Sequence, residues 1–218
     1  MKGSAPTYSA YVDQGTNRAY PTGVSYDANG NASLTATMIY DVENRVAGYT
    51  STSTYYGYDV QNKRIYTSGS YDSYGNPTGY TVVMYSPGGQ KLGTYRIDLG
   101  SNLQITLLTS DIYFGGRRIS TMDRLGSAGK YYPYGEAKGG TNPADAWSFA
   151  TYWRDSNSNL DYADQRYYSN QFGRFMTPDP YVATARTPTD PRNPQSWNRY
   201  AYVQGDPINF IDPRGLTL

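Results

Sequence analysis

Apolar and polar positions alternate over short stretches in the first half of the chain. Residues 33–40 (SLTATMIY) and 79–85 (GYTVVMY) are rich in β-branched and aromatic residues and contain no charged side chain. This pattern is typical of β-strands. The sequence also holds 23 Gly and 13 Pro, which favour tight turns over helices. We therefore predict an all-β chain of antiparallel strands, with a strand in each of these two stretches.

A five-residue unit recurs between the predicted strands, and its first residue is always Tyr, at 14-, 18-, 13- and 14-residue steps. In each unit the Tyr is followed by Asp or Ser, and Gly or Asn lies three positions after that second residue. The units are Tyr26-Asp27 with Gly30, Tyr40-Asp41 with Asn44, Tyr58-Asp59 with Asn62, Tyr71-Asp72 with Gly75, and Tyr85-Ser86 with Gly89. An Asp that begins a turn accepts hydrogen bonds from amides further along, and Gly or Asn tolerates the left-handed backbone that closes a hairpin. We predict one hairpin turn per unit, with the tyrosines at strand ends as structural residues. Stacking of exposed tyrosines on sugars is the alternative.

Composition removes several classes of function. The chain has 218 residues, 19 Lys and Arg against 18 Asp and Glu, and neither His nor Cys. Catalysis by Ser-His-Asp or Cys-His, thiol chemistry and zinc sites built on Cys or His are therefore excluded. A net charge of +1 favours neither nucleic acid nor anionic lipid as a partner. We expect no cofactor, no metal and no membrane insertion, and residues 1–20 contain no apolar run typical of a signal peptide.

Arginine lies beside aromatic residues throughout the second half. The pairs include Arg166-Tyr167-Tyr168, Gly173-Arg174-Phe175 and Arg199-Tyr200. Guanidinium groups stack on aromatic rings and bridge carboxylates, so we expect them to pair with Asp161, Asp164 and Asp179. The residues predicted to build this region are Asp123, Arg124, Gly126, Arg166, Tyr167, Tyr168, Gly173 and Arg174. Binding of single-stranded nucleic acid by the same residues is disfavoured because acidic residues interrupt the run.

The repeated unit and the second half together resemble RHS (rearrangement hotspot) proteins, also called YD-repeat proteins. This family includes the C components of bacterial toxin complexes and the teneurins. The resemblance rests on the Tyr-Asp units, on Leu160–Ser169 and Phe172–Pro180, and on Asn198–Leu216 with its Asp212-Pro213-Arg214-Gly215-Leu216 end. It implies an N-terminal segment at 1–19, YD-type hairpins at 20–115 and an RHS core at 116–218.

In that family the repeats form a spiralling β-sheet that makes a hollow shell, and the core closes one end as a plug. The resemblance therefore implies a structural scaffold of a secreted or cell-surface toxin-delivery protein. Its expected partners are a C-terminal toxin payload or other copies of itself. Two alternatives remain open, namely an adhesion module that binds glycans and a subunit of a homopolymeric extracellular fibre.

The resemblance also implies self-cleavage. Many family members cut themselves after the Leu of the terminal motif with two aspartates, and the matching positions here are Asp179, Asp212 and the Leu216-Thr217 bond. Paired carboxylates suit such chemistry, because one held protonated acts as the acid while the other activates water. The sequence departs from the family in having Tyr181-Val182 where Gly-Leu usually follows Asp179-Pro180, and Asp190 is a possible substitute for Asp179. The alternative to cleavage is structural, namely that the Asp-Pro pairs terminate turns. We expect at most this single-turnover activity and no conventional enzyme.

Overall fold

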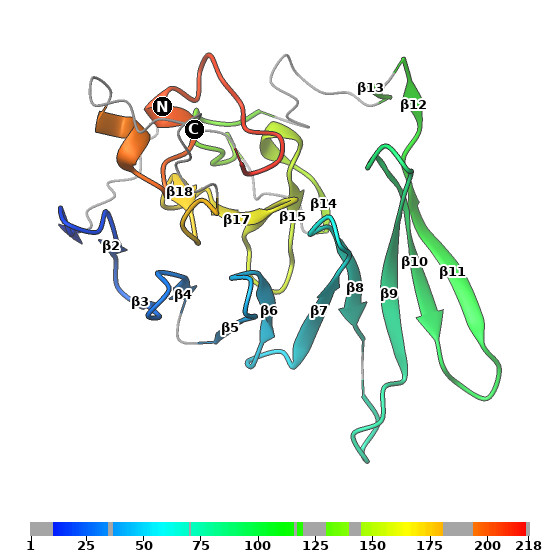
Figure 1. Cartoon of the computed structure of the whole chain (residues 1–218). Coiled ribbons are helices and arrows are strands. Elements are labelled where there is room, and N and C mark those ends of the chain that lie inside the picture. The colour runs from blue at the N-terminus through cyan, green and yellow to red at the C-terminus, as the bar shows by residue number, and fades with distance from the viewer. Residues whose placement is uncertain are drawn as a thin grey trace. The chain divides into compact units, whose positions relative to one another are not determined.

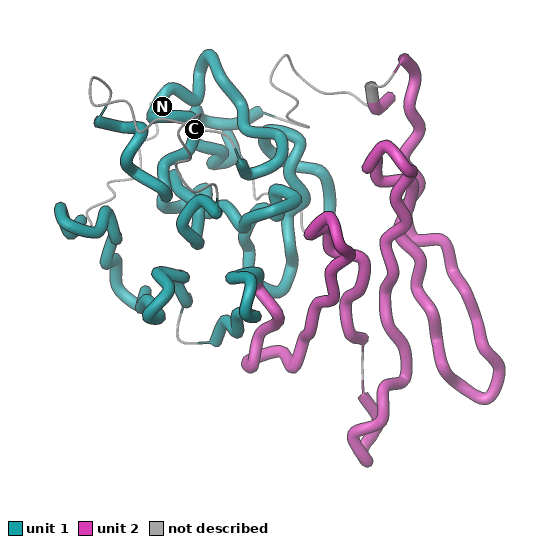
Figure 2. The backbone as a smooth tube through the Cα atoms, in the orientation of Figure 1, with its two compact units in different colours: residues 1–45, 122–218 teal, residues 46–121 magenta. Residues whose placement is uncertain are grey.

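The fold is all-β, as predicted. The structure, a computed structural model, describes residues 11–34, 37–69, 71–115, 117–119, 130–139, 145–180 and 194–216. Over these residues the regular elements are antiparallel strands and three short 3₁₀ turns (Figure 1). The chain divides into two compact units, the first made of residues 1–45 and 122–218 and the second of residues 46–121 (Figure 2).

The second unit is a meander in which each strand pairs with the next one in sequence. Its main strands lie in the order β11-β10-β9-β8-β7-β6. Their bounds are β6 Val46–Tyr49, β7 Thr54–Tyr58, β8 Arg64–Ser68, β9 Gly79–Tyr85, β10 Lys91–Asp98 and β11 Gln104–Ser110, and a two-stranded ribbon of β12 Tyr113–Phe114 and β13 Arg117–Arg118 follows. The predicted strand at 79–85 is β9, and it pairs with β10 from Gly79↔Asp98 to Tyr85↔Lys91.

The first unit contains residues from the beginning of the chain and residues from its end. Its N-terminal strands are β1 Tyr11–Val12, β2 Ala19–Tyr20, β3 Val24–Tyr26, β4 Ala32–Leu34 and β5 Met38–Tyr40. Its C-terminal part is a sheet in the order β14-β15-β16-β17-β18, with bounds β14 Ala146–Trp147, β15 Trp153–Arg154, β16 Asp161–Ala163, β17 Arg166–Ser169 and β18 Arg174–Phe175. The 3₁₀ turns are η1 Phe149–Thr151, η2 Pro194–Trp197 and η3 Val203–Gly205.

The predicted strand stretch at 33–40 holds strand at both of its ends, β4 Ala32–Leu34 and β5 Met38–Tyr40, while residues 35 and 36 lie outside the described residues. The amide of Thr37 and its hydroxyl both donate to the carbonyl of Leu34, at 3.3 and 3.1 Å.

The repeat units form the predicted turns, and one carboxylate oxygen organises each turn that begins with Asp, while the Ser86 hydroxyl accepts the Gln90 amide at 3.1 Å in the fifth unit. At Asp41, Oδ1 accepts the amides of Glu43 and Arg45, both at 2.9 Å. The same atom of Asp59 accepts the amides two and four residues on, at 2.9 and 2.8 Å, and that of Asp72 does so at 2.8 and 2.9 Å. Gly or Asn at the closing position has positive φ in all five units, from +63° at Asn44 to +89° at Gly30. The Asp side chain thus accepts hydrogen bonds from backbone amides that a tight turn leaves without a backbone partner.

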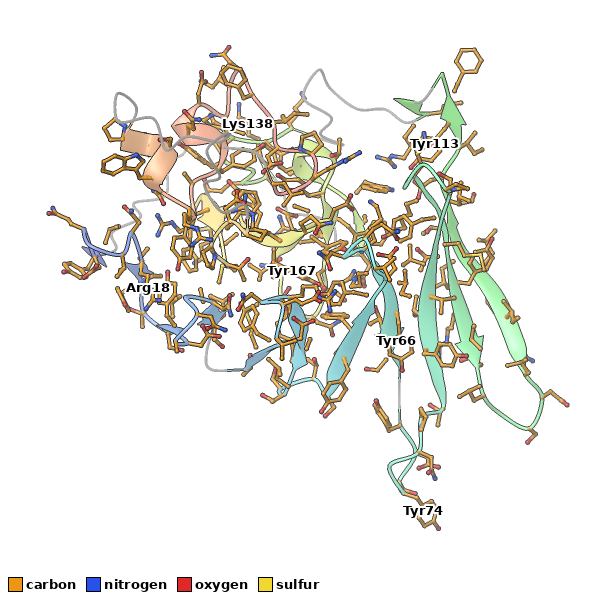
Figure 3. All side chains as sticks on the ribbon, in the orientation of Figure 1. Arg18, Tyr66, Tyr74, Tyr113, Lys138 and Tyr167 are labelled. Carbon is orange, nitrogen blue, oxygen red and sulfur yellow. The ribbon has the colours of Figure 1, made fainter. Side chains whose placement is uncertain are left out.

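The tyrosines of four of the five units anchor their turns to an earlier part of the chain. The hydroxyl of Tyr26 donates to the carbonyl of Ala19 at 2.9 Å, and that of Tyr58 donates to Val46 at 2.6 Å. Tyr40 and Tyr85 bond the carbonyls of Ala32 and Arg64 in the same way. Their rings therefore lie over the sheet while each hydroxyl has a partner, as a half-buried Tyr requires. Tyr71 is more exposed, at 41%, and Tyr74 lies at the turn tip, 90% exposed (Figure 3).

Candidate functional site

The end of the chain repeats the geometry of the Tyr-Asp turns. Asp212 Oδ1 accepts the amides of Arg214 and Leu216, two and four residues on, at 3.3 and 3.1 Å. Gly215 closes the turn with φ +66°, and its amide donates to the carbonyl of Asp212 at 3.4 Å. The spacing from Asp212 to Gly215 equals that from Asp27 to Gly30. The terminal motif is therefore the same aspartate-centred turn that four of the five repeat units form.

What distinguishes this copy is the partner of the second carboxylate oxygen. In the repeats, Oδ2 is held by the side chain four residues on, namely Asn31 for Asp27, Arg45 for Asp41 and Asn76 for Asp72. Position four after Asp212 is Leu216, which has no polar side chain. Oδ2 of Asp212 instead lies 3.5 Å from the guanidinium of Arg166 on β17. The turn thus directs one carboxylate oxygen at the core of the unit.

Arg166 brings the two predicted aspartates together. The same terminal nitrogen, Nη2, lies 3.0 Å from Asp179 Oδ2 and 3.5 Å from Asp212 Oδ2. All three side chains are buried, each exposed by 1% or less. The other guanidinium nitrogens donate to the carbonyls of Gly215 and Arg199, and the ring of Phe175 packs 3.6 Å below the charge. Two carboxylates therefore share one buried cation.

Asp179 reaches this centre because its backbone is pinned. Its amide donates to the carbonyl of Arg199 at 2.8 Å, and the guanidinium of Arg199 donates back to the carbonyl of Asp179. Burial lowers the pKa of Arg166, and the charges of Asp179 and Asp212 oppose that shift. An arginine remains protonated through such a shift because its ordinary pKa lies above 12.

An aromatic cluster supports the centre from one side, and sequence reasoning missed its principal member, Tyr152. The cluster comprises Phe149, Ala150, Tyr152, Ala163, Tyr168, Phe175, Tyr202 and Val203. The hydroxyl of Tyr152 donates to the carbonyl of Asp212, which ties the terminal turn to the core. Burial raises the pKa of Tyr152 well above its usual range, so this hydroxyl stays a donor at neutral pH. The contact joins residues 60 positions apart, for which the sequence holds no local signal.

A second buried ion pair lies next to the first along the sheet. Arg154 Nη2 is 2.8 Å from Asp161 Oδ2, and both side chains are exposed by 1% or less. Burial raises the pKa of Asp161 to about 7, against the lowering effect of Arg154. The expected pairing of Asp161 with an arginine is therefore present, but its partner Arg154 was not among the predicted residues.

The remaining predicted residues lie in several parts of the chain. Tyr167 and Tyr168 are buried on β17, where their hydroxyls donate to Asp155 Oδ2 at 3.2 Å and to the carbonyl of Tyr134 at 2.9 Å. Arg174 donates to the carbonyl of Asn17 at 2.9 Å. Asp123, Arg124, Gly126 and Asp190 lie outside the described residues, as does Thr217 of the predicted cleavage bond. Among the described residues there is no group of His, Asp or Glu that could hold a metal ion, and no helix long and apolar enough to cross a membrane.

Solved structures of bacterial toxin complexes share this fold. The chain superposes on a structure named TcdB2-TccC3-TEV with a TM-score of 0.55 and 18% identity, over 95% of this chain and 13% of that one. It superposes on the Photorhabdus luminescens Tc holotoxin pore, which carries the mutation TccC3-D651A, with a TM-score of 0.52 and 17% identity, over 94% and 12%. A structure named TcdB2-TccC3 gives 0.51 and 17%, over 95% and 13%. No family model and no curated protein sequence matches the chain.

The chain therefore has an RHS-like fold, as its motifs predicted. It spans about an eighth of the length of the solved chains that it matches.

Proposed function

We propose that this chain is a structural part of an RHS-type shell, of the kind found in secreted or surface toxin-delivery proteins. In this proposal residues 20–115 form part of the wall of the shell, and residues 116–218 form the plug that closes one end. The observation that carries it is the turn repeated five times, with each Asp closing a hairpin and most of the tyrosines bonding an earlier strand. Such a unit extends a sheet one hairpin at a time without a conventional aliphatic core. The fold shared with TccC3 structures supports it.

Electron microscopy of the complete reading frame that contains this chain tests the scaffold. We expect closed, hollow particles. Solid particles or unfolded chain would contradict the proposal. Filaments would favour a homopolymeric fibre instead, and a partner that copurifies inside the particle would identify a payload.

A second function is favoured by the Arg166–Asp179–Asp212 centre, namely a single self-cleavage after Leu216. The reaction requires one carboxyl to be ionised and the other protonated. The ionised carboxylate takes a proton from water, the hydroxide adds to the carbonyl carbon of Leu216, and the protonated carboxyl gives its proton to the departing amine of Thr217. Leu216 gains the new carboxylate, so atoms and charges balance. The Leu216 amide is 3.1 Å from Asp212 Oδ1, which supports this reaction because the bond to be cut begins at the same residue.

In this reaction Arg166 is a positioning residue. Its charge holds both carboxylates at one place, and its Nε bonds the carbonyl of Gly215, one residue before Leu216. The intact mass of a chain extended beyond Leu218 by a stable reporter domain tests the reaction. We expect a product that ends at Leu216, and we expect D179N and D212N each to leave the chain uncut. A wild-type chain that stays uncut while folded would remove self-cleavage but leave the scaffold proposal standing.

A further inference from the structure

The first unit carries a groove that lies apart from the buried aspartate centre. It has a volume of about 540 Å³, within the range of small-molecule sites. Aromatic and amide side chains line it, among them Tyr132, Tyr134, Phe172, Asn170, Gln171 and Asn198. Lys138, labelled in Figure 3, places its ammonium 5.1 Å from the ring of Tyr132.

The ring of Tyr134 is held in place from several directions. Its hydroxyl donates to the carbonyl of Gly205 at 3.3 Å, and its own carbonyl accepts the Tyr168 hydroxyl at 2.9 Å. A Cβ at Gly173 would lie only 3.1 Å from its Cδ1, so the glycine makes room for the ring. Yet the residue is 37% exposed. Tyr134 is therefore a rigid aromatic surface open to solvent, which loses little conformational entropy when a ligand stacks on it.

The backbone beside the groove is in an unfavourable conformation. Val203, Gln204 and Gly205 have φ of +42°, +54° and +85°, a left-handed conformation that residues other than Gly rarely adopt. Strained backbone of this kind gathers at binding sites, where the surrounding structure holds it. Here it presents the Gly205 carbonyl to Tyr134.

We propose that this groove binds a short neutral oligosaccharide, with Tyr134 as the stacking platform. The hydroxyl of Tyr134 already has a partner, so the residue offers its ring, and the negative face of the ring attracts the C–H groups of a sugar. Amide side chains at the rim, such as Gln171 and Asn198, supply the donors and acceptors that sugar hydroxyls need. The lining contains one carboxylate, Glu136, and one guanidinium, Arg174, and the Lys138 ammonium lies against the ring of Tyr132. The other lining side chains are uncharged, which suits a neutral ligand.

Calorimetric titration of the folded chain with cellotetraose, maltotetraose and tetra-N-acetylchitotetraose tests this site. We expect at least one of these sugars to bind with a Kd below about 1 mM. Y134A should weaken that binding at least about tenfold, and Q171A should weaken it less. The matched control is Y74A, which removes an exposed tyrosine from a turn tip of the other unit and should leave the Kd unchanged.

Several outcomes would overturn the proposal. They are the absence of binding by all three sugars at about 10 mM, equal loss of binding in Y134A and Y74A, or displacement of the sugar by a proline-rich peptide that binds more tightly. Since Y134A could perturb folding, its circular dichroism and urea midpoint are measured beside it, and Q171A provides an exposed variant that keeps the test valid. The site is independent of self-cleavage, so D212N should bind the sugar as the wild type does.

Discussion

Replacing Arg166 with Met removes the cation that two buried carboxylates share. Breaking a buried ion pair by removing one partner costs about 3–5 kcal/mol. The carbonyl of Gly215 also loses its donor, which adds about 1–3 kcal/mol. We therefore expect R166M to lower the free energy of unfolding of the first unit by at least about 4 kcal/mol, a large share of the 5–15 kcal/mol typical of a domain.

Urea unfolding followed by tryptophan fluorescence measures this loss. All three tryptophans, Trp147, Trp153 and Trp197, belong to the first unit, so the signal reports on the unit that holds Arg166. At a slope of about 2 kcal/mol per M, the midpoint should fall by about 2 M. R166K keeps the charge but not the planar fork of donors, and its midpoint should lie between those of R166M and the wild type.

The matched control is R96M. The pair of Arg96 with Asp98 is 2.7 Å long, but the two side chains are 55% and 33% exposed. Exposed pairs contribute about 0–1 kcal/mol, and this one lies in the other unit, so the tryptophan midpoint should not move. An R166M midpoint equal to that of R96M would refute the conclusion that the buried cation holds the site together.

Three further outcomes follow from the geometry. G215A should destabilise the first unit by more than G75A destabilises the second. A Cβ at Gly215 would lie 2.8 Å from the Ala163 carbonyl oxygen, whereas nothing lies within 4 Å of a Cβ at Gly75. Urea titrations of both variants, followed by circular dichroism, measure the two losses of stability. The folded pKa of Asp161 is about 7 against 3.8 for the ordinary group, so folded chain keeps a proton that unfolded chain releases, and stability of the first unit should fall as pH rises from about 4 to about 7 and level off above it. D161N should remove that pH dependence, and a wild-type profile that rises over this window would contradict the assignment. The double variant R154M/D161L should be more stable than R154M, because R154M leaves the carboxylate of Asp161 buried without its cation and D161L removes that carboxylate. Equal urea midpoints for the two variants would argue against a buried ion pair.

The turns were predictable because their chemistry is local. Asp at the first position and Gly or Asn three residues on determine the hydrogen bonds and the sign of φ within a few residues. The same signal is present at Asp212 and Gly215, where the Asp-Pro pair also predicts a turn.

Contacts across long sequence distances were not predictable. Tyr152 contacts Asp212 across 60 positions and Tyr134 contacts Gly205 across 71, and no spacing in the sequence indicates either contact. The left-handed conformations of Ala150 and Val203 are also invisible to composition, because neither residue type favours them. Motif resemblance nevertheless selected Asp179 and Asp212, which the fold brings to one guanidinium.

The most direct test of the scaffold proposal is electron microscopy of the complete reading frame that contains this chain. We expect closed, hollow particles with a wall of antiparallel strands. Solid particles or unfolded chain would contradict the scaffold.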